Sequence, residues 1–422
     1  MHRAAVVTAL GIGQLLAWGS TFYLPAVLAE PMAGDLGVSV PTVFLAFSVA
    51  MVGSALVGPS AGRAIDRWGG RPVLVGTNLL FAAGLAALGA AWDGPTLFLA
   101  WGLVGLAMGA GLYEAAFATV VRLYGTAAKD TITGITLFGG FASTVGWPLS
   151  AWMEARWGWR GACVGWALLH LGVALPLHAC LPRAPAGPAR AARPVDGSTV
   201  GRAVPDGRRA GAGTAAAAGA GAGSGLGTHG ASERGVGPGT RERLATVLLA
   251  FLFASTWFVT TSFAAHGPRL LEAAGATAAA AVAVGAIVGP AQVLGRLTQF
   301  WPLRRADPLK VAGVATLGHP AAVLVLLIGG PAFAPLFALL HGAGGGLMTI
   351  ARGALPLALF GPVGYGERQG VLMAPTRVAQ AVAPYLFGLA LERWGAQALW
   401  GSAALCVAGW LALRALPRPV PE

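Results

Sequence analysis

Most of this chain consists of apolar stretches of about 20 residues, the length that an α-helix needs to cross the hydrocarbon core of a bilayer. Hydrophobic residues make up 56% of the 422 residues and charged residues only 10%, whereas a soluble domain carries about 25% charged residues. Too few polar side chains remain to cover a surface that faces water. The sequence therefore predicts an all-α polytopic membrane protein.

We expect twelve membrane-spanning helices in two sets of six. The predicted spans are 4–28, 41–61, 72–92, 95–121, 132–153, 161–181, 244–265, 276–297, 308–329, 333–355, 370–391 and 396–413. Residues 183–243 are rich in Gly, Ala, Pro and Arg without hydrophobic periodicity, which predicts a disordered linker. The predicted domains are an N-terminal bundle, residues 1–182, and a C-terminal bundle, residues 244–422. The first apolar run is too long for a signal peptide and is read as a span.

The distribution of arginine predicts the orientation of these helices. With the N-terminus in the cytoplasm, the linker brings nine arginines and four acidic residues to the cytoplasmic side, and the short loops there add nine Lys or Arg. The loops on the opposite side hold four arginines mixed with six acidic residues. This bias places both termini in the cytoplasm. It also explains the net charge of +12 without nucleic acid, because the basic residues form no single stripe.

One charged segment separates the second and third predicted spans. It reads Gly62-Arg63-Ala64-Ile65-Asp66-Arg67-Trp68-Gly69-Gly70-Arg71-Pro72. Charges are kept out of hydrocarbon at a cost of several kcal/mol, so we expect a very short loop at the membrane surface. The pattern Gly-x-x-x-Asp-Arg-x-Gly-x-Arg resembles the signature loop between helices 2 and 3 of the major facilitator superfamily (MFS) of transporters.

The two halves of the chain also resemble each other. In the fifth predicted span Gly134 is followed by Pro148, and in the eleventh Gly370 is followed by Pro384 at the same spacing. Duplicated halves are typical of transporters whose site lies between the repeats. The resemblance to the superfamily covers nearly the whole chain and implies two six-helix bundles. It further implies that helices 1, 4, 7 and 10 line a central cavity and that helices 2, 5, 8 and 11 form the interface.

The same resemblance implies that the charged loop is a gate, which braces the two bundles when the site faces outward. The residues concerned are Gly62, Asp66, Arg67, Gly69 and Arg71. Asp66 suits this role because a carboxylate is favoured near a helix N-terminus, and the eleventh helix begins on this side. The simpler interpretation is a charged surface loop that stops the helix pair from sliding.

Three ionisable residues, Glu114, Arg352 and Arg377, lie within predicted spans. An intramembrane charge is by default a functional-site hypothesis. Two guanidiniums can hold a carboxylate or similar oxyanion bidentately, and a half-buried Glu could exchange a proton during transport. The simpler interpretation is a structural ion pair, or snorkelling to the headgroups. If Glu114 and Arg352 pair directly, the Glu stays ionised and the proton-coupling role fails.

Further candidates for the cavity are polar or aromatic residues of the same helices. They are Gln14, Trp18, Tyr113 and Trp257. Such residues often only bond a neighbouring helix, and we interpret the intramembrane histidines 170, 319 and 341 in that way. The three cysteines fall in apolar stretches and predict neither disulfides nor a metal site. The sequence contains no phosphate-binding loop that would indicate ATP, so we expect no cofactor and no enzymatic activity.

The favoured interpretation is a secondary active transporter of a bacterial cytoplasmic membrane that works by alternating access. Its expected partners are a small organic anion as substrate, protons as coupling ions and the lipid bilayer; we expect a monomer. A drug or cation extruder is the first alternative, although Trp147 interrupts the Gly-Pro motif of such antiporters in the fifth span. A membrane receptor or scaffold that kept the fold and lost transport is the second alternative.

Overall fold

A computed structural model describes residues 2–183, 238–300, 303 and 306–416 of the chain. Every regular element in these ranges is helical. Most of the predicted linker lies outside them, and its last residues form the start of α10. The longer helices are α1 (Arg3–Gly19), α2 (Pro25–Leu36), α3 (Val40–Trp68), α4 (Gly70–Gly89), α5 (Gly94–Gly111), α6 (Tyr113–Tyr124), α7 (Lys129–Gly140), α8 (Ala142–Leu169), α10 (Pro238–Ala273), α11 (Ala278–Leu297), α12 (Pro308–Gly329), α13 (Ala334–Phe360), α14 (Tyr365–Trp394) and α15 (Ala398–Arg414).

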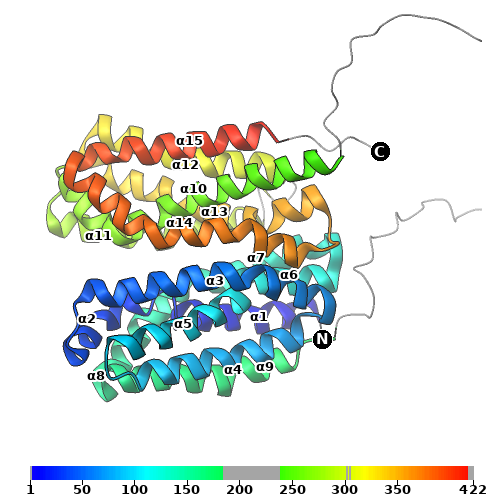
Figure 1. Cartoon of the computed structure of the whole chain (residues 1–422). Helices are drawn as coiled ribbons and strands as arrows, with labels where there is room; N and C mark the ends of the chain where they lie inside the picture. The colour runs from blue at the N-terminus through cyan, green and yellow to red at the C-terminus, as the bar shows by residue number, and fades with distance from the viewer. Residues whose placement is uncertain (1, 184–237, 301–302, 304–305, 417–422) are drawn as a thin grey trace, which may run out of the picture.

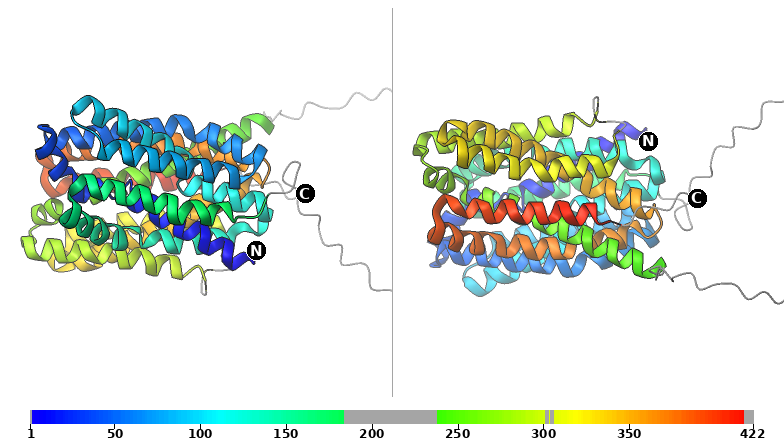
Figure 2. Two further views of the ribbon diagram at one scale, coloured as in Figure 1. Left: turned by 90° about the horizontal axis from the view of Figure 1, so that it is seen from below. Right: turned by 90° about the horizontal axis from the view of Figure 1, so that it is seen from above.

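The helices form two bundles that lie side by side. Figure 1 shows α1 to α9 in one bundle and α10 to α15 in the other, with their axes running roughly in the same direction. The start of α1 and the end of α15 lie at the same end, which we call the terminal face, and α2 lies at the other, the distal face (Figures 1 and 2). The short elements are η1 (Gly125–Ala128), η2 (His170–Ala174), α9 (Leu175–Ala179), η3 (Pro331–Phe333) and η4 (Gly395–Gln397).

Eight segments of the described chain are long and apolar enough to cross a membrane. The longest of them, Gly94–Ala179 and Tyr365–Arg414, have 86 and 50 residues, more than the 20 or so that one crossing needs. The chain reverses inside them at glycines with positive φ: Gly125 at 58°, Gly158 at 69° and Gly395 at 55°. When the two longest segments are divided at these three glycines and the shorter apolar helix α1 is added, the segments fit the twelve expected crossings.

Three of the predicted spans are interrupted, which the sequence did not predict. The first was expected to be continuous over 4–28, but α1 ends at Gly19. The hydroxyl of Thr21 donates to the carbonyl of Ala17 at 2.6 Å, and Pro25, which lacks a backbone N–H, begins α2. The fourth span breaks at Leu112, whose ψ is −166°, and the fifth breaks after α7.

The charged segment after the second span is mostly helix and not loop, contrary to expectation. Helix α3 continues to Trp68, so that Asp66 lies in its last turns, and α4 already begins at Gly70. Only Gly69 separates them, with φ 81° and ψ 164°, a backbone conformation that favours glycine. The basic side chains of the segment are long enough to reach water from the end of the helix. A loop longer than Gly69 is therefore not required.

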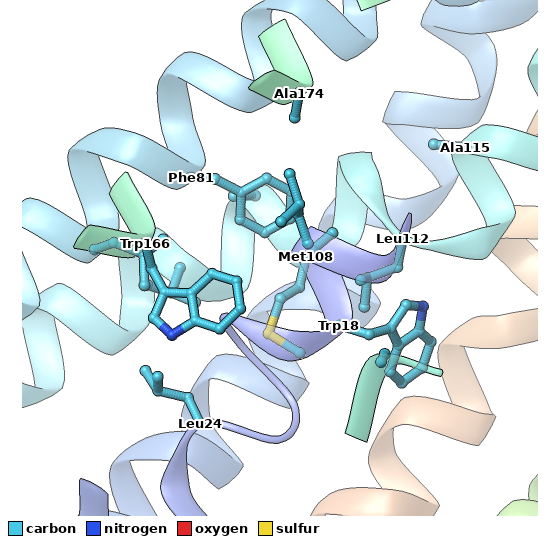
Figure 3. Packing of buried hydrophobic residues seen from close by; sticks show 14 of the residues in the cluster. Trp18, Leu24, Phe81, Met108, Leu112, Ala115, Trp166 and Ala174 are labelled. Atoms are coloured by element: carbon cyan, nitrogen blue, oxygen red, sulfur yellow. The ribbon is translucent and has the colours of Figure 1, made fainter. Parts of the chain in front are cut away.

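Large apolar side chains fill the interior of the N-terminal bundle. Figure 3 shows Trp18, Phe81, Met108 and Trp166 packed together from different helices. Many other large apolar side chains face outward instead; Leu56 and Ile328 are each 77% exposed. An outer surface of this kind suits lipid as the solvent, since no hydrophobic cost arises there.

Candidate functional site

The break in the fourth span positions the first part of the site. Because the helix stops at Gly111, its carbonyl lacks an intrahelical partner. The side-chain amide of Gln14, from α1, donates to this carbonyl at 2.8 Å in the buried interior. A new helix, α6, begins directly afterwards, with Tyr113 as its first residue and Glu114 in its first turn. The broken backbone thus places a carboxylate deep inside the bundle.

Glu114 meets two arginines of the other bundle. Its Oε2 accepts a hydrogen bond from Nη2 of Arg377 at 2.9 Å, and its Oε1 lies 3.9 Å from Nη1 of Arg352. The side chains of Arg352 and Arg377 are 0% and 3% exposed, and that of Glu114 is 12% exposed. Nη1 of Arg377 also donates to Oε1 of Gln380 at 3.2 Å. The ion pairs of Glu114 with Arg352 and Arg377 therefore connect the two bundles through their buried centre.

Aromatic rings surround the two guanidiniums. The guanidinium carbon of Arg352 lies 4.4 Å from the ring centroid of Trp257, and that of Arg377 lies 5.6 Å from the ring of Trp18. The two tryptophan rings stack on each other with centroids 6.1 Å apart. Tyr113 packs against Trp18 at 5.2 Å. Cation–π contacts of this kind are worth about 2 kcal/mol or more when desolvated.

The structure thus brings together all the residues that the sequence singled out for a cavity. We call this group the central cluster: Gln14, Trp18, Tyr113, Glu114, Trp257, Arg352 and Arg377. The cavity beside Glu114 and Arg377 measures only about 10 Å³, the room of a single water molecule. A larger solute therefore requires side chains or bundles to move apart.

Hydrogen bonding leaves part of this cluster unsatisfied. The Nε, Nη1 and Nη2 atoms of Arg352 are buried without a hydrogen-bond partner, as is Oε1 of Glu114. Only the backbone carbonyl of Arg352 is used, as an acceptor for the side chain of Gln369 at 3.1 Å. Buried polar groups are nearly always hydrogen-bonded. Three unpartnered donors on one guanidinium therefore indicate a place for an acceptor.

A third buried arginine was missed by the sequence analysis as a site residue. Arg296, on α11, is 4% exposed and its Nε and Nη1 atoms have no hydrogen-bond partner. It follows Gly295 at the end of the predicted span 276–297, where a basic residue is ordinary. Its place close to a predicted helix end concealed its depth in the assembled bundle.

The intramembrane histidines bond neighbouring helices, as expected. His170 contacts the hydroxyl of Ser20 at 2.9 Å and the side-chain oxygen of Asn78 at 3.0 Å. His319 contacts His341 and Ser402, both at 2.9 Å. These contacts hold helices together within each bundle. Among the described residues no group of His, Cys, Asp or Glu is suited to a metal ion.

The second part of the site lies at the terminal face. Oδ1 of Asp66 accepts from the backbone N–H of Gly366 at 3.0 Å, and Oδ2 accepts from that of Glu367 at 2.9 Å. These N–H groups belong to the first turn of α14, where the helix dipole favours a negative charge. A further ion pair joins Arg63 to Glu367 at 3.0 Å. The carboxylate of Asp66 in one bundle thus caps a helix of the other.

Close backbone contact accompanies this cap. A Cβ added to Gly62 would collide with the backbone carbonyl of Gly366, and one added to Gly370 would lie 2.5 Å from the carbonyl of Gly58. Of the other expected gate residues, Arg67 is exposed and lies over Trp68 with 5.6 Å to the ring centroid. Gly69 makes the turn, and Arg71 lies half-buried in the first turn of α4.

Comparison with known proteins decides the family. The model of the Major Facilitator Superfamily matches residues 10–339, more than three quarters of the chain. The chain belongs to the major facilitator superfamily. It is a multi-pass membrane protein with the fold of this superfamily of transporters.

Solved MFS structures share this fold over nearly all of the chain. The MFS transporter FucP in its outward conformation covers 98% of this chain and 99% of its own, with 14% identity and a TM-score of 0.69. The human organic anion transporter MFSD10 (TETRAN) covers 98% and 100%, with 17% identity and a TM-score of 0.64. The proton:xylose symporter XylE covers 99% and 96%, with 13% identity and a TM-score of 0.68.

Proposed function

We propose that this MFS protein is a secondary active transporter that moves a small organic anion by alternating access. The observation that carries the proposal is the guanidinium of Arg352, fully buried between the bundles with its Nε, Nη1 and Nη2 atoms unpartnered. Arg377 lies beside it and shares Glu114 with it. The expected setting is a bacterial cytoplasmic membrane with both termini in the cytoplasm, as the arginine distribution favours.

Charge and surface at the central cluster both favour an organic anion. A hydrogen bond to a charged group contributes about 1.5–3 kcal/mol, so a carboxylate that met the free donors of Arg352 would be held firmly and could be bound bidentately. The stacked rings of Trp18 and Trp257 supply apolar faces for the body of the solute. A compact inorganic ion would leave those faces unused.

The cap at the terminal face supports alternating access. Asp66 and α14 close that face in this conformation, while the central cluster lies between the same two bundles. If the cap opens and a corresponding contact closes at the distal face, the cluster becomes accessible from the other side. The gate and the site then lie on one interface, as a rocking mechanism requires.

Proton coupling through Glu114 is one candidate for the driving force. In its favour, an incoming anion would compete with Glu114 for Arg377, and the displaced carboxylate would be free to take up a proton. FucP and XylE are described as proton symporters. Against it, the pairing of Glu114 with two guanidiniums stabilises its charged form in this conformation. The main proposal therefore assigns Glu114 as a fixed counter-charge.

The geometry disfavours the alternative of a cation or drug extruder. Such a protein would offer a free carboxylate to its substrate, whereas Glu114 is held by Arg377 and faces Arg352. A cation would have to approach two buried positive charges, which costs several kcal/mol at an effective dielectric constant of about 20. A receptor or scaffold that binds the anion without moving it is separated from the proposal by the uptake measurement described next.

The test begins with binding and ends with transport. The purified protein is unfolded thermally in the presence of small carboxylates and, in parallel, of organic cations. A specific ligand raises the melting temperature by mass action, and we expect carboxylates alone to do so. The same carboxylates are then offered to proteoliposomes, with and without a pH gradient. Uptake without dependence on that gradient supports the fixed role of Glu114.

Two variants make the test specific. Arg352→Ala should abolish the carboxylate shift, because it removes the unpartnered donors. Arg393→Ala is the matched control; it also removes one positive charge, but from an exposed position near the end of α14. Stabilisation by cations only, or an undiminished carboxylate shift in Arg352→Ala, would refute the proposal. Binding without uptake would favour the receptor.

A further inference from the structure

Arg296 lies on α11, the helix that packs along α13, and α13 carries Arg352. Helices α11 and α13 run in the same direction from the distal face. Gly295, directly before Arg296, packs against the backbone of Ala343 on α13. The two guanidiniums therefore extend from neighbouring helices of the C-terminal bundle.

Two consecutive glycines of the facing bundle make room for Arg296 and for Tyr113. A Cβ on Gly140 would collide with Nη1 of Arg296, and a Cβ on the neighbouring Gly139 would collide with the hydroxyl oxygen of Tyr113. The ring of Tyr113 is also 5.9 Å from the guanidinium carbon of Arg352. Arg296 and Tyr113 therefore pack against adjacent positions of α7, and Tyr113 also lies near Arg352.

Arg296 has no acidic partner among the residues that the structure describes. Its one hydrogen bond is donated by Nη2 to the neutral amide oxygen of Gln292 at 3.3 Å, while Nε and Nη1 stay unpartnered. Of the three buried guanidiniums of the C-terminal bundle, only those of Arg352 and Arg377 therefore meet a carboxylate, and both meet the same one, Glu114. With that carboxylate ionised, two positive charges are uncompensated, and buried charges normally require a partner.

We propose that the transported solute is a dicarboxylate, bound with one carboxylate at Arg352 and Arg377 and the other at Arg296. This inference rests on the proposed function and names its substrate class. Two negative charges balance the two uncompensated positive ones, so the loaded interior is electrically neutral. Because Arg352 and Arg377 share Glu114 whereas Arg296 extends from another helix and faces Gly140, two carboxylates on a short carbon chain match the two groups of donors better than a single compact dianion does.

The experiment compares pairs of ligands of equal chain length on the full-length protein. Saturated dicarboxylates of two to six carbons are titrated against monocarboxylates of the same length, and sulfate serves as the compact dianion. Unfolding is followed by the fluorescence of the native tryptophans, and affinities are taken from the concentration dependence of the shift. We expect at least one dicarboxylate to bind tenfold or more tightly than its monocarboxylate partner and than sulfate.

Variants of Arg296 then assign the second carboxylate. In Arg296→Gln the preferred dicarboxylate should lose tenfold or more in affinity, while monocarboxylates should bind as they do in the unchanged protein. Arg296→Lys keeps the charge and should retain part of the preference. Arg393→Gln is the exposed control and should alter neither affinity. Without ligand, Arg296→Gln should be no less stable than the parent, because it removes an unpaired buried charge.

The possible results are separable. If monocarboxylates or sulfate bind as tightly as every dicarboxylate, or if Arg296→Gln weakens both ligand classes equally, the dicarboxylate assignment is overturned and anion transport stands. If Arg296→Gln melts well below the parent without ligand, Arg296 is a structural residue and the assignment is overturned as well. If no anion stabilises the parent protein, the proposed function itself fails.

Discussion

Replacing Asp66 by asparagine tests the gate, because the change is nearly isosteric and removes the charge. Asp66 accepts two backbone hydrogen bonds from the start of α14, at 3.0 and 2.9 Å. Each such bond to a charged acceptor is worth about 1.5–3 kcal/mol, and a neutral one about 0.5–1.5 kcal/mol. Asparagine keeps one acceptor oxygen and loses the other.

These values give the free energy by which Asp66→Asn destabilises the closed terminal face. We take the lower end of the resulting range, about 2 kcal/mol, because Glu367 is partly exposed and water competes for its backbone N–H. At 1.4 kcal/mol for each factor of ten, the ratio of closed to open terminal face should fall about 30-fold. Both N–H groups meet water when the face opens, so the fold itself should survive while transport falls.

Spin labels across the two bundles measure this ratio directly. Trp68 and Val363 are 63% and 55% exposed. Trp68 is the last residue of α3 and Val363 directly precedes α14, and these two helix ends lie on opposite bundles at the terminal face. Cysteines at both positions carry the labels after the three native cysteines are replaced. Electron–electron distance measurements should show one short distance in the parent and a second, longer one in Asp66→Asn.

A matched control uses another acidic helix cap. Asp93 accepts from the backbone N–H of Thr96 at 2.9 Å and caps α5 within one bundle, at the distal face. Asp93→Asn should leave the distance distribution between the labels unchanged. If Asp66→Asn also leaves it unchanged and transport is unaffected, the reasoning about the gate is wrong.

Three further predictions address the same interface. Glu114→Gln removes the counter-charge of two buried arginines and should lower stability by about 3–5 kcal/mol; an unchanged melting temperature would contradict the ion pair. Gly62→Ala adds a Cβ that collides with the carbonyl of Gly366 and should widen the label distance, whereas Gly53→Ala, on the same helix with open space beside it, should not. Trp257→Ala removes the ring beneath Arg352 and should weaken anion binding by about 0.5–2 kcal/mol, measured by ligand titration against the parent.

The sequence predicted the positions of most spans because apolar length is a strong local signal. The exact residue at which each helix begins or ends was predicted less accurately, and the interruptions of the first, fourth and fifth spans were missed altogether. A break at Leu112 depends on where Gly111 finds a substitute partner for its carbonyl, and that partner is Gln14, almost a hundred positions away. No local pattern contains this information.

The site was predictable to a similar degree. Glu114, Arg352 and Arg377 stood out because a charge in an apolar run is rare, and the structure places them within one cluster. Arg296 did not stand out, since it lies next to the end of its span, where a basic residue is ordinary. Its burial depends on Gly140 of the opposite bundle, a contact that becomes visible only when the bundles are assembled.

A last prediction concerns helix α14, which is held by the N-terminal bundle at two levels. Asp66 caps its first turn, and Glu114 binds Arg377 eleven or so residues further along. Pro375 lies between these two points, and a proline can bend a helix there because it removes a backbone hydrogen bond. If α14 moves as one rigid body, opening the gate must also draw Arg377 away from Glu114.

The label distances in Asp66→Asn, Glu114→Gln and the double variant decide between these two behaviours. For a rigid helix, either single change already weakens both contacts, so the double variant should shift the closed-to-open ratio by less than the product of the single shifts. Coupling between sites that share an element is typically about 0.5–3 kcal/mol. If instead the shifts multiply, Pro375 acts as a hinge, and the gate and the site open independently. In that case occupancy of the central cluster could not control the gate through α14.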